Sequence, residues 1–406
     1  MLSKAINFFY PDIRKNEVKK FSLFALALFF TIGTYWILRL LKDVLIYDLA
    51  FPTELGWGIG YGRELVPHMK LISLGVVLLF VLIYSKLVDR YKKHQLFYII
   101  GGFYIALFSI VTLVMWVEAM YGASVIGWFP LAAVGIAGYF ATESFGSLIV
   151  ALFWSFAVSS TKTDEAKRGF PFVIAAAQIG SIGGSALVFY DIPEWMLFLL
   201  CNLTILGVIL TIRYIVKTIP KDQMVSDKEE KKEKPDFLAG IKLLATRPYL
   251  MGVLVVSTFY EIAKTVVDYQ MKSQASTIPG FMKFKTFIGI YGMSVNGLAF
   301  VMALFGTSYI IKRFGLRFCL LSYPVTFAAS MIGLYLYYTT GPSAHNLLWA
   351  TFFVMMLVTA ISYAVNNPTK EMMYIPTSKD AKFKVKGFTD MFGSRSAKMS
   401  GAQIGG

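Results

Sequence analysis

Charged residues are scarce in this chain, and so are histidine and cysteine. Only 16% of the 406 residues are charged, three are histidines and two are cysteines. Soluble domains carry roughly 25% charged residues. Cys201 and Cys319 both lie in long apolar runs, so we expect neither a disulfide framework nor a cysteine-based metal site. The histidines have no metal-ligand spacing either, which leaves no bound metal to expect.

The strings that mark common catalytic sites are also absent from the sequence. There is no G-x-x-x-x-G-K-[ST] loop to hold phosphates, no HExxH zinc motif and no GxSxG nucleophile turn. The longest polar stretch has about 30 residues, which is too short to fold as a catalytic domain. We therefore expect a protein that is not an enzyme and that carries no cofactor.

Apolar residues dominate what remains. They make up 56% of the chain, and the mean hydropathy is +0.61. A helix needs roughly 20 apolar residues to cross a bilayer core of about 30 Å. Ten runs are long enough, and they predict an all-α membrane protein embedded in a lipid bilayer. The runs are residues 21–44, 68–88, 96–117, 128–158, 170–190, 195–216, 249–268, 287–311, 318–338 and 346–366.

The net charge of +15 is unevenly distributed. Basic residues gather on alternate connections between the runs, beginning with the segment before residue 21. This bias predicts that the N-terminus lies in the cytoplasm. Lys272, Lys283 and Lys285 depart from the pattern, because they fall on the opposite side. No cleavable signal is visible. We expect a multi-pass protein of a bacterial inner membrane, with no nucleic-acid partner.

A charged segment divides the ten runs into six and four. Residues 218–247 contain the mixed-charge string DKEEKKEK and predict a solvated linker between an N-terminal half (1–217) and a C-terminal half (248–406). Two short matches relate the halves: YSKLVDRYKK to YIIKRFGL, and AQIG at 177–180 to AQIG at 402–405. The offsets, 223 and 225, indicate a duplicated six-helix unit. The second half is then incomplete, with four helices and the start of a further one, and the chain is expected to be truncated.

Several charged residues lie within the apolar runs, where a charge costs about 2.5–3.5 kcal/mol. Arg39 and Lys42 share one helix face, and Glu143 lies halfway along the fourth run. Glu261 and Lys264 form a stripe with Asp268. Such groups must face a bundle interior or a wet cavity.

Structural alternatives exist for each of these charges. Lys264 has the right spacing to pair with Glu261 or Asp268. Arg39 and Lys42 are close enough to the end of their run to extend toward headgroups. Glu143 has no cation within four residues, so its structural alternative is a partner on another helix.

Four strings make the chain resemble the ATP/ADP translocases, the nucleotide transporters of plastids and obligate intracellular bacteria. They are LRLLKD at 38–43; ESFGS at 143–147 leading into LFW; Tyr260-Glu261; and KEMMYIP at 370–376 continuing to KVKG at 384–387. The resemblance implies a major-facilitator-like bundle of two six-helix halves that exchanges ATP for ADP, and it implies transport roles for Lys42, Glu143 and Glu261. It also implies a further lysine between Lys370 and Lys386, for which we favour Lys386.

Charge complementarity suggests how such a protein would work. Arg39 and Lys42 could neutralise part of the charge of ATP or ADP. Glu143 and Glu261 could accept hydrogen bonds from the adenine amino group or the ribose, or pair with the lysines when the site is empty. A carrier of another anionic solute and a proton-coupled nucleoside triphosphate importer remain open. We expect the protein to work as a monomer.

Overall fold

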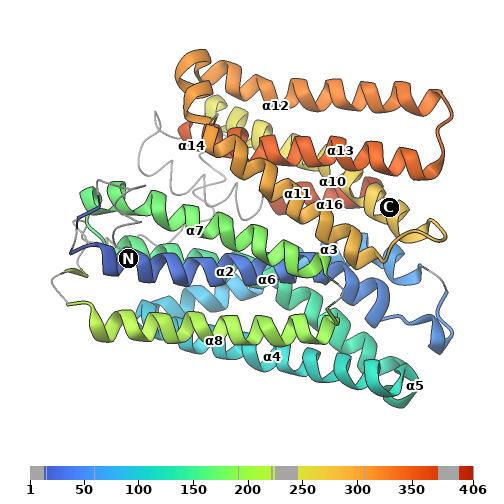
Figure 1. Cartoon of the computed structure of the whole chain (residues 1–406), viewed down its shortest axis with the longest axis horizontal. Helices are drawn as coiled ribbons and strands as arrows, with labels where there is room; N and C mark the ends of the chain where they lie inside the picture. Colours follow the sequence, from blue (N-terminus) through green and yellow to red (C-terminus); the bar gives the residue numbers. More distant parts are fainter. Residues whose placement is uncertain are drawn as a thin grey trace. The chain divides into compact units, whose positions relative to one another are not determined.

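The computed structural model describes residues 13–14, 16–58, 60–190, 192–220, 223–224, 246–305, 307–373 and 393–405 (Figure 1). Lys386 and most of the expected linker lie outside these residues. The described chain forms two compact units. The first holds residues 1–62, 75–231 and 288–293, and the second holds residues 63–74, 232–287 and 294–406. The half boundaries expected at residues 217 and 248 stay a prediction.

Every regular element in the described part is helical. Early in the chain come α2 (Val18–Val44), η1 (Leu45–Leu49), η2 (Thr53–Leu55), α3 (Tyr61–Arg90), α4 (Lys93–Tyr121), α5 (Ala123–Ile126), α6 (Trp128–Ser159), α7 (Thr163–Phe189) and α8 (Glu194–Thr218). Later come α10 (Pro248–Thr277), α11 (Phe284–Phe305), α12 (Thr307–Thr339), α13 (Ala344–Ile361), η4 (Ser362–Asn366), α14 (Asn367–Met373) and α16 (Ser394–Gly405).

Ten helices in the described residues are long and apolar enough to cross a membrane, as the sequence predicts. Several boundaries differ from the expected ones, among them the ends of α10 and α11. The seventh helix, α10, continues nine residues past its expected end, to Thr277. Within this extension the Lys272 ammonium lies 3.0 Å from the Asp268 carboxylate. The pairing explains how a helix with a lysine in its last turns can continue, because the i,i+4 partner offsets the charge. The eighth helix ends at Phe305 instead of residue 311, and the YIIKRFGL segment begins the next helix, which bends at Gly315 (φ +77°).

Helices α2 and α7 lie side by side in the first unit, in backbone contact (Figure 1). A Cβ built on Gly180 would lie 2.5 Å from the main-chain oxygen of Phe29, and one on Gly184 would collide with the main chain of Gly33. Both contacts advance by four residues along each helix, so the two helices run parallel. Small residues permit this close approach, which maximises dispersion contacts where lipid offers no hydrophobic drive.

The second unit repeats this arrangement with α10 and α16. A Cβ on Gly401 would lie 2.5 Å from the main-chain oxygen of Ile262, and one on Gly405 would lie 3.2 Å from Cα of Val266. Gly180 and Gly405 are the last residues of the two AQIG strings. In each unit, therefore, the helix with this string packs in parallel on the unit's first long helix, as expected for related halves.

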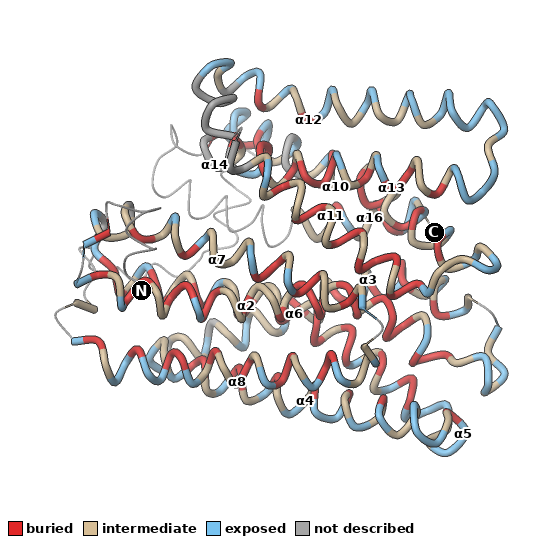
Figure 2. Tube along the Cα trace, in the orientation of Figure 1, coloured by how far each residue is buried: buried red, intermediate tan, exposed pale blue. Residues whose placement is uncertain are grey.

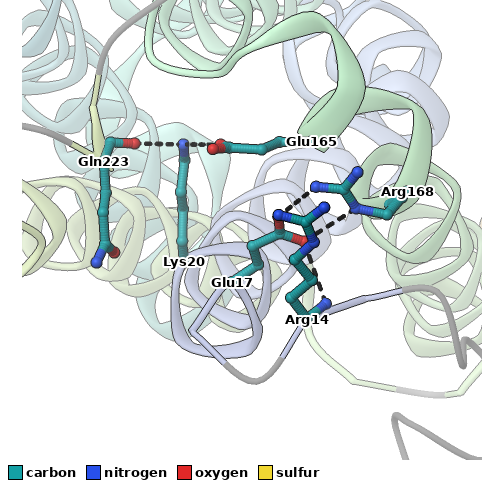
Figure 3. Close-up of polar contacts among 6 residues, drawn as sticks. All are labelled: Arg14, Glu17, Lys20, Glu165, Arg168 and Gln223. Carbon is teal, nitrogen blue, oxygen red and sulfur yellow. Dashed lines mark hydrogen bonds and ion pairs between the residues drawn. The ribbon is translucent and has the colours of Figure 1, made fainter.

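An ion-pair network joins the start of α2 to the start of α7 (Figure 3). The Lys20 ammonium, almost fully buried, lies 3.0 Å from Glu165 and 2.6 Å from the main-chain oxygen of Gln223. Glu17 accepts hydrogen bonds from the Arg168 guanidinium. The network therefore fixes three segments that are distant in sequence: the start of α2, the start of α7 and the chain after α8.

Burial differs sharply between helices (Figure 2). Helix α2 buries residues along its whole length, whereas α12 exposes large apolar side chains such as Leu321, Val325 and Ile332. Exposed apolar residues along a candidate membrane span are suited to contact with lipid. Both cysteines are buried and free in the structure.

Candidate functional site

The first unit brings Lys42 of α2 together with Glu143 of α6. Their side chains form an ion pair, with 16% and 19% of the side-chain surface exposed. The Lys42 ammonium also lies 5.5 Å from the centroid of the Tyr139 ring. The carboxylate and the ring offset the cost of holding the ammonium within a membrane-spanning bundle. Glu143 thus has the partner on another helix that its position in the sequence demands.

Arg39 lies one turn before Lys42 and takes up a different environment. Its guanidinium donates to the Tyr35 hydroxyl at 3.3 Å and lies 4.7 Å from the centroid of the Trp36 ring. Both partners belong to α2 itself. The aromatic groups orient the Arg39 guanidinium, whereas a carboxylate, that of Glu143, offsets the charge of Lys42.

Glu261 of α10 is the centre of a charge cluster in the second unit. Three lysine side chains act on its half-buried carboxylate by Coulombic attraction: Lys264, Lys370 and Lys398. They come from α10, α14 and α16 respectively. The lysines outnumber the carboxylate in this group of four residues, so positive charge predominates there, and Lys398 is exposed to solvent. This excess of positive charge makes the second-unit cluster a candidate site for a polyanion.

Tyr260 contacts two members of this cluster. Lys370 donates a hydrogen bond to the Tyr260 hydroxyl, and its ammonium lies 4.2 Å from the centroid of the same ring. The hydroxyl also hydrogen-bonds with Glu261 and Ser362. The ring packs edge-on against Tyr323, at 4.9 Å between centroids.

Lys264 and Asp268 do not form the simple pair that their spacing suggests. Asp268 makes its ion pair with Lys272, one turn further along α10. Lys264 is buried, lies 5.4 Å from the centroid of the Tyr363 ring, and attracts both Glu261 and Asp268 electrostatically.

A short π-helix adjoins each cluster. η1 begins two residues after Asp43, and η4 ends four residues before Lys370. π-helical turns widen the helix, leave some carbonyl groups less well paired and are frequent at functional sites. Their presence beside both clusters marks these regions as departures from a plain membrane-spanning helix.

Sequence reasoning missed Lys398. The twelve residues of α16 have few apolar side chains, so hydropathy does not mark this helix. The signal that was present is the AQIG string four residues later, which places Lys398 on the counterpart of α7. Lys386, favoured from the sequence within the stretch from Lys370 to Lys386, lies outside the described residues.

A family model described as the TLC ATP/ADP transporter matches residues 1–121 and 136–405. The chain belongs to the TLC ATP/ADP transporter family. Family membership confirms the resemblance found in the sequence. It makes the chain a multi-pass membrane transporter and confirms that it is not an enzyme.

Relatives of this TLC transporter cover nearly all of it. The ADP,ATP carrier protein 1 of Rickettsia bellii is 25% identical, over 97% of this chain and 86% of the relative. The ADP,ATP carrier protein 1 of Chlamydia muridarum is also 25% identical, over 99% of this chain and 84% of the relative. The chloroplastic ADP,ATP carrier protein 2 of Arabidopsis thaliana is 26% identical, over 97% of this chain and 69% of the relative.

Solved transporters share the fold at low sequence identity. A bacterial homologue of the iron transporter ferroportin, in an inward-facing state, has a TM-score of 0.63 at 12% identity, over 96% of this chain and 91% of that one. The nucleoside transporter NupG has a TM-score of 0.61 at 12% identity, over 95% of this chain and 90% of that one. These likenesses confirm the expected major-facilitator-like fold and bear on the fold alone.

Proposed function

We propose that this TLC transporter exchanges ATP for ADP across a membrane by alternating access. The observation that carries the proposal is the second-unit cluster, in which Lys264, Lys370 and Lys398 attract Glu261 electrostatically and Lys370 donates a hydrogen bond to Tyr260. Its surplus of positive charge suits a ligand with several negative charges, and ATP and ADP carry three or four. Membership of a family of ATP/ADP transporters supplies the class of ligand.

The second-unit cluster gives the proposal a reason for obligatory exchange. With no nucleotide bound, Glu143 offsets the charge of Lys42. In the second unit the lysines outnumber Glu261, so an empty carrier retains a surplus of positive charge there, of which the exposed Lys398 is in contact with water. Moving that charge out of contact with water costs several kcal/mol, and a bound nucleotide removes much of the cost. Reorientation with nucleotide bound is therefore favoured over reorientation when empty.

Particular residues take particular parts in this proposal. In the second unit, Lys264, Lys370 and Lys398 bind phosphate groups; in the first unit, Lys42 becomes available to an anion once it leaves Glu143, beside the positive charge of Arg39. Glu143 and Glu261 hold the lysines in the empty state and accept hydrogen bonds from the nucleoside. Lys386 remains a candidate from the sequence. We also propose that the protein works as a monomer in a bacterial inner membrane with a cytoplasmic N-terminus.

Purified protein in liposomes tests the exchange. Vesicles preloaded with ADP should take up labelled ATP, and vesicles without internal nucleotide should not. Equal uptake into empty vesicles would contradict obligatory exchange. Uptake into empty vesicles that depends on an inward proton gradient would instead indicate a proton-coupled triphosphate importer. Uptake of another anion that ATP does not inhibit would indicate a carrier for that solute.

A further inference from the structure

Tyr260 holds a central place in the second-unit cluster without carrying a charge. Its hydroxyl accepts a hydrogen bond from Lys370, and the Lys370 ammonium also lies 4.2 Å from its ring centroid. The same hydroxyl interacts with Glu261 and with Ser362 of η4. One side chain therefore links α10, η4 and α14 at the point where the lysines gather.

A comparison of the two units supports a role for Tyr260 in holding a cation. At an offset of 225, Tyr35, Arg39 and Asp43 of α2 align with Tyr260, Lys264 and Asp268 of α10. The i, i+4, i+8 spacing puts each set on one helix face. In both units the tyrosine hydroxyl accepts a hydrogen bond from a cation: Arg39 donates to Tyr35 at 3.3 Å, and Lys370 donates to Tyr260. A hydrogen bond from a cation to the aligned tyrosine thus recurs, although Arg39 belongs to the tyrosine's own helix and Lys370 comes from α14.

The physical effect of a hydroxyl on a lysine differs from that of a carboxylate. A carboxylate offsets the ammonium charge, so an incoming phosphate must compete with it. The hydroxyl and the ring of Tyr260 orient the Lys370 ammonium without themselves cancelling its charge, while Glu261 attracts it electrostatically. The lysine side chain has a flexible stem of four carbons, and it loses considerable rotamer entropy when it is held in one conformation. Fixing it before the ligand arrives removes part of that cost from binding.

We propose that Tyr260 is a positioning residue that holds Lys370 ready for the phosphate groups of the substrate. The inference rests on the proposed function for the identity of the substrate, since it assigns the Lys370 ammonium to a polyphosphate. Tyr260 does not contact the phosphates itself. Its ring is fixed by edge-on packing against Tyr323, which is almost fully buried, so the hydroxyl has a defined position.

The test compares Tyr260→Phe with Tyr323→Phe, the same chemical change on the adjoining ring. In ADP-loaded liposomes, Tyr260→Phe should raise the KM for ATP roughly tenfold, the worth of one charge-assisted hydrogen bond, with Vmax within about twofold. Tyr323→Phe should leave both unchanged. Tyr260→His, which retains a hydrogen-bond acceptor, should recover part of the loss and provides a second variant. Size-exclusion chromatography establishes that each variant is folded.

A double mutant separates positioning from general loosening. If Tyr260 acts through Lys370, Tyr260→Phe combined with Lys370→Ala should be no worse than Lys370→Ala alone. Multiplied losses in the double mutant would overturn the proposal, and so would an unchanged KM in Tyr260→Phe.

Calorimetric titration of the detergent-purified protein with inorganic tripolyphosphate keeps the two proposals apart. Tyr260→Phe should weaken this binding by the same factor as it raises the KM. If the wild type binds tripolyphosphate but fails to exchange ATP for ADP, the proposed function fails, and the comparison of variants still decides the part played by Tyr260. Equal affinities in wild type and Tyr260→Phe would overturn the positioning inference whatever the transport result.

Discussion

The Lys20 ammonium lies 3.0 Å from the Glu165 carboxylate, and its side chain is only 2% exposed. Glu165→Gln removes the carboxylate charge from a buried cation that remains. We expect this to destabilise the protein by about 1–3 kcal/mol and to lower the thermal midpoint in detergent by a few degrees. Lys162→Gln, an exposed change in the same region, should stay within about 0.5 kcal/mol. Equal midpoints for the two variants would show that the pair adds no stability.

The ion pair between Lys42 and Glu143 predicts opposite effects for its two members. Lys42→Ala should reduce labelled ATP uptake by roughly a hundredfold while the protein still inserts, because a phosphate partner is lost. Glu143→Gln should lower the KM for ATP, since the nucleotide no longer competes for Lys42, and should slow turnover because release becomes harder. Uptake at the wild-type rate in Lys42→Ala would refute its contact with phosphate.

Two adjacent glycines of α7 provide a matched pair for the helix contact. A Cβ on Gly184 would collide with the main chain of Gly33, whereas one on Gly183 meets nothing within 4 Å. Gly184→Ala should cost about 1–3 kcal/mol through overpacking. Gly183→Ala should stabilise the helix by about 0.5–1 kcal/mol. Thermal midpoints should therefore move in opposite directions, and a shared direction would contradict the backbone contact between α2 and α7.

Lys398 should matter for transport although it lies outside the ten long apolar helices. Lys398→Gln removes one of the three cations that attract Glu261. Loss of a charged hydrogen bond to phosphate costs about 1.5–3 kcal/mol, so the KM for ATP should rise between tenfold and a hundredfold. Arg317→Gln, an exposed change in the second unit, serves as control. The comparison is made by competition of unlabelled ATP against labelled uptake. A KM matching that of Arg317→Gln would remove Lys398 from the site.

The ten helices could be predicted from the sequence because a membrane-spanning segment must satisfy its own backbone and must be apolar over its length. The errors fall where this rule stops applying. Helix α10 continues past residue 268 because Asp268 and Lys272 offset each other's charge. The start of α12 contains Lys312 and Arg313, which indicate a loop when only hydropathy is considered.

The site was predictable as a set of residues and not as a set of contacts. A charge within an apolar run identified Lys42 and Glu143, but they are 101 residues apart, and only the fold brings α2 and α6 together. Lys398 was missed because a short helix of mixed polarity gives no clear hydropathy signal. The contact of Lys370 with Tyr260 depends on a tyrosine that resembles an ordinary apolar residue in sequence.

The burial of Cys201 and Cys319 makes this chain convenient for site-directed labelling. Neither thiol has exposed surface, so a water-borne maleimide should react slowly with the native protein. A single cysteine introduced at a chosen position would then report its own solvent access against a low background. Paired spectroscopic probes could follow the movements of transport without first replacing the native cysteines.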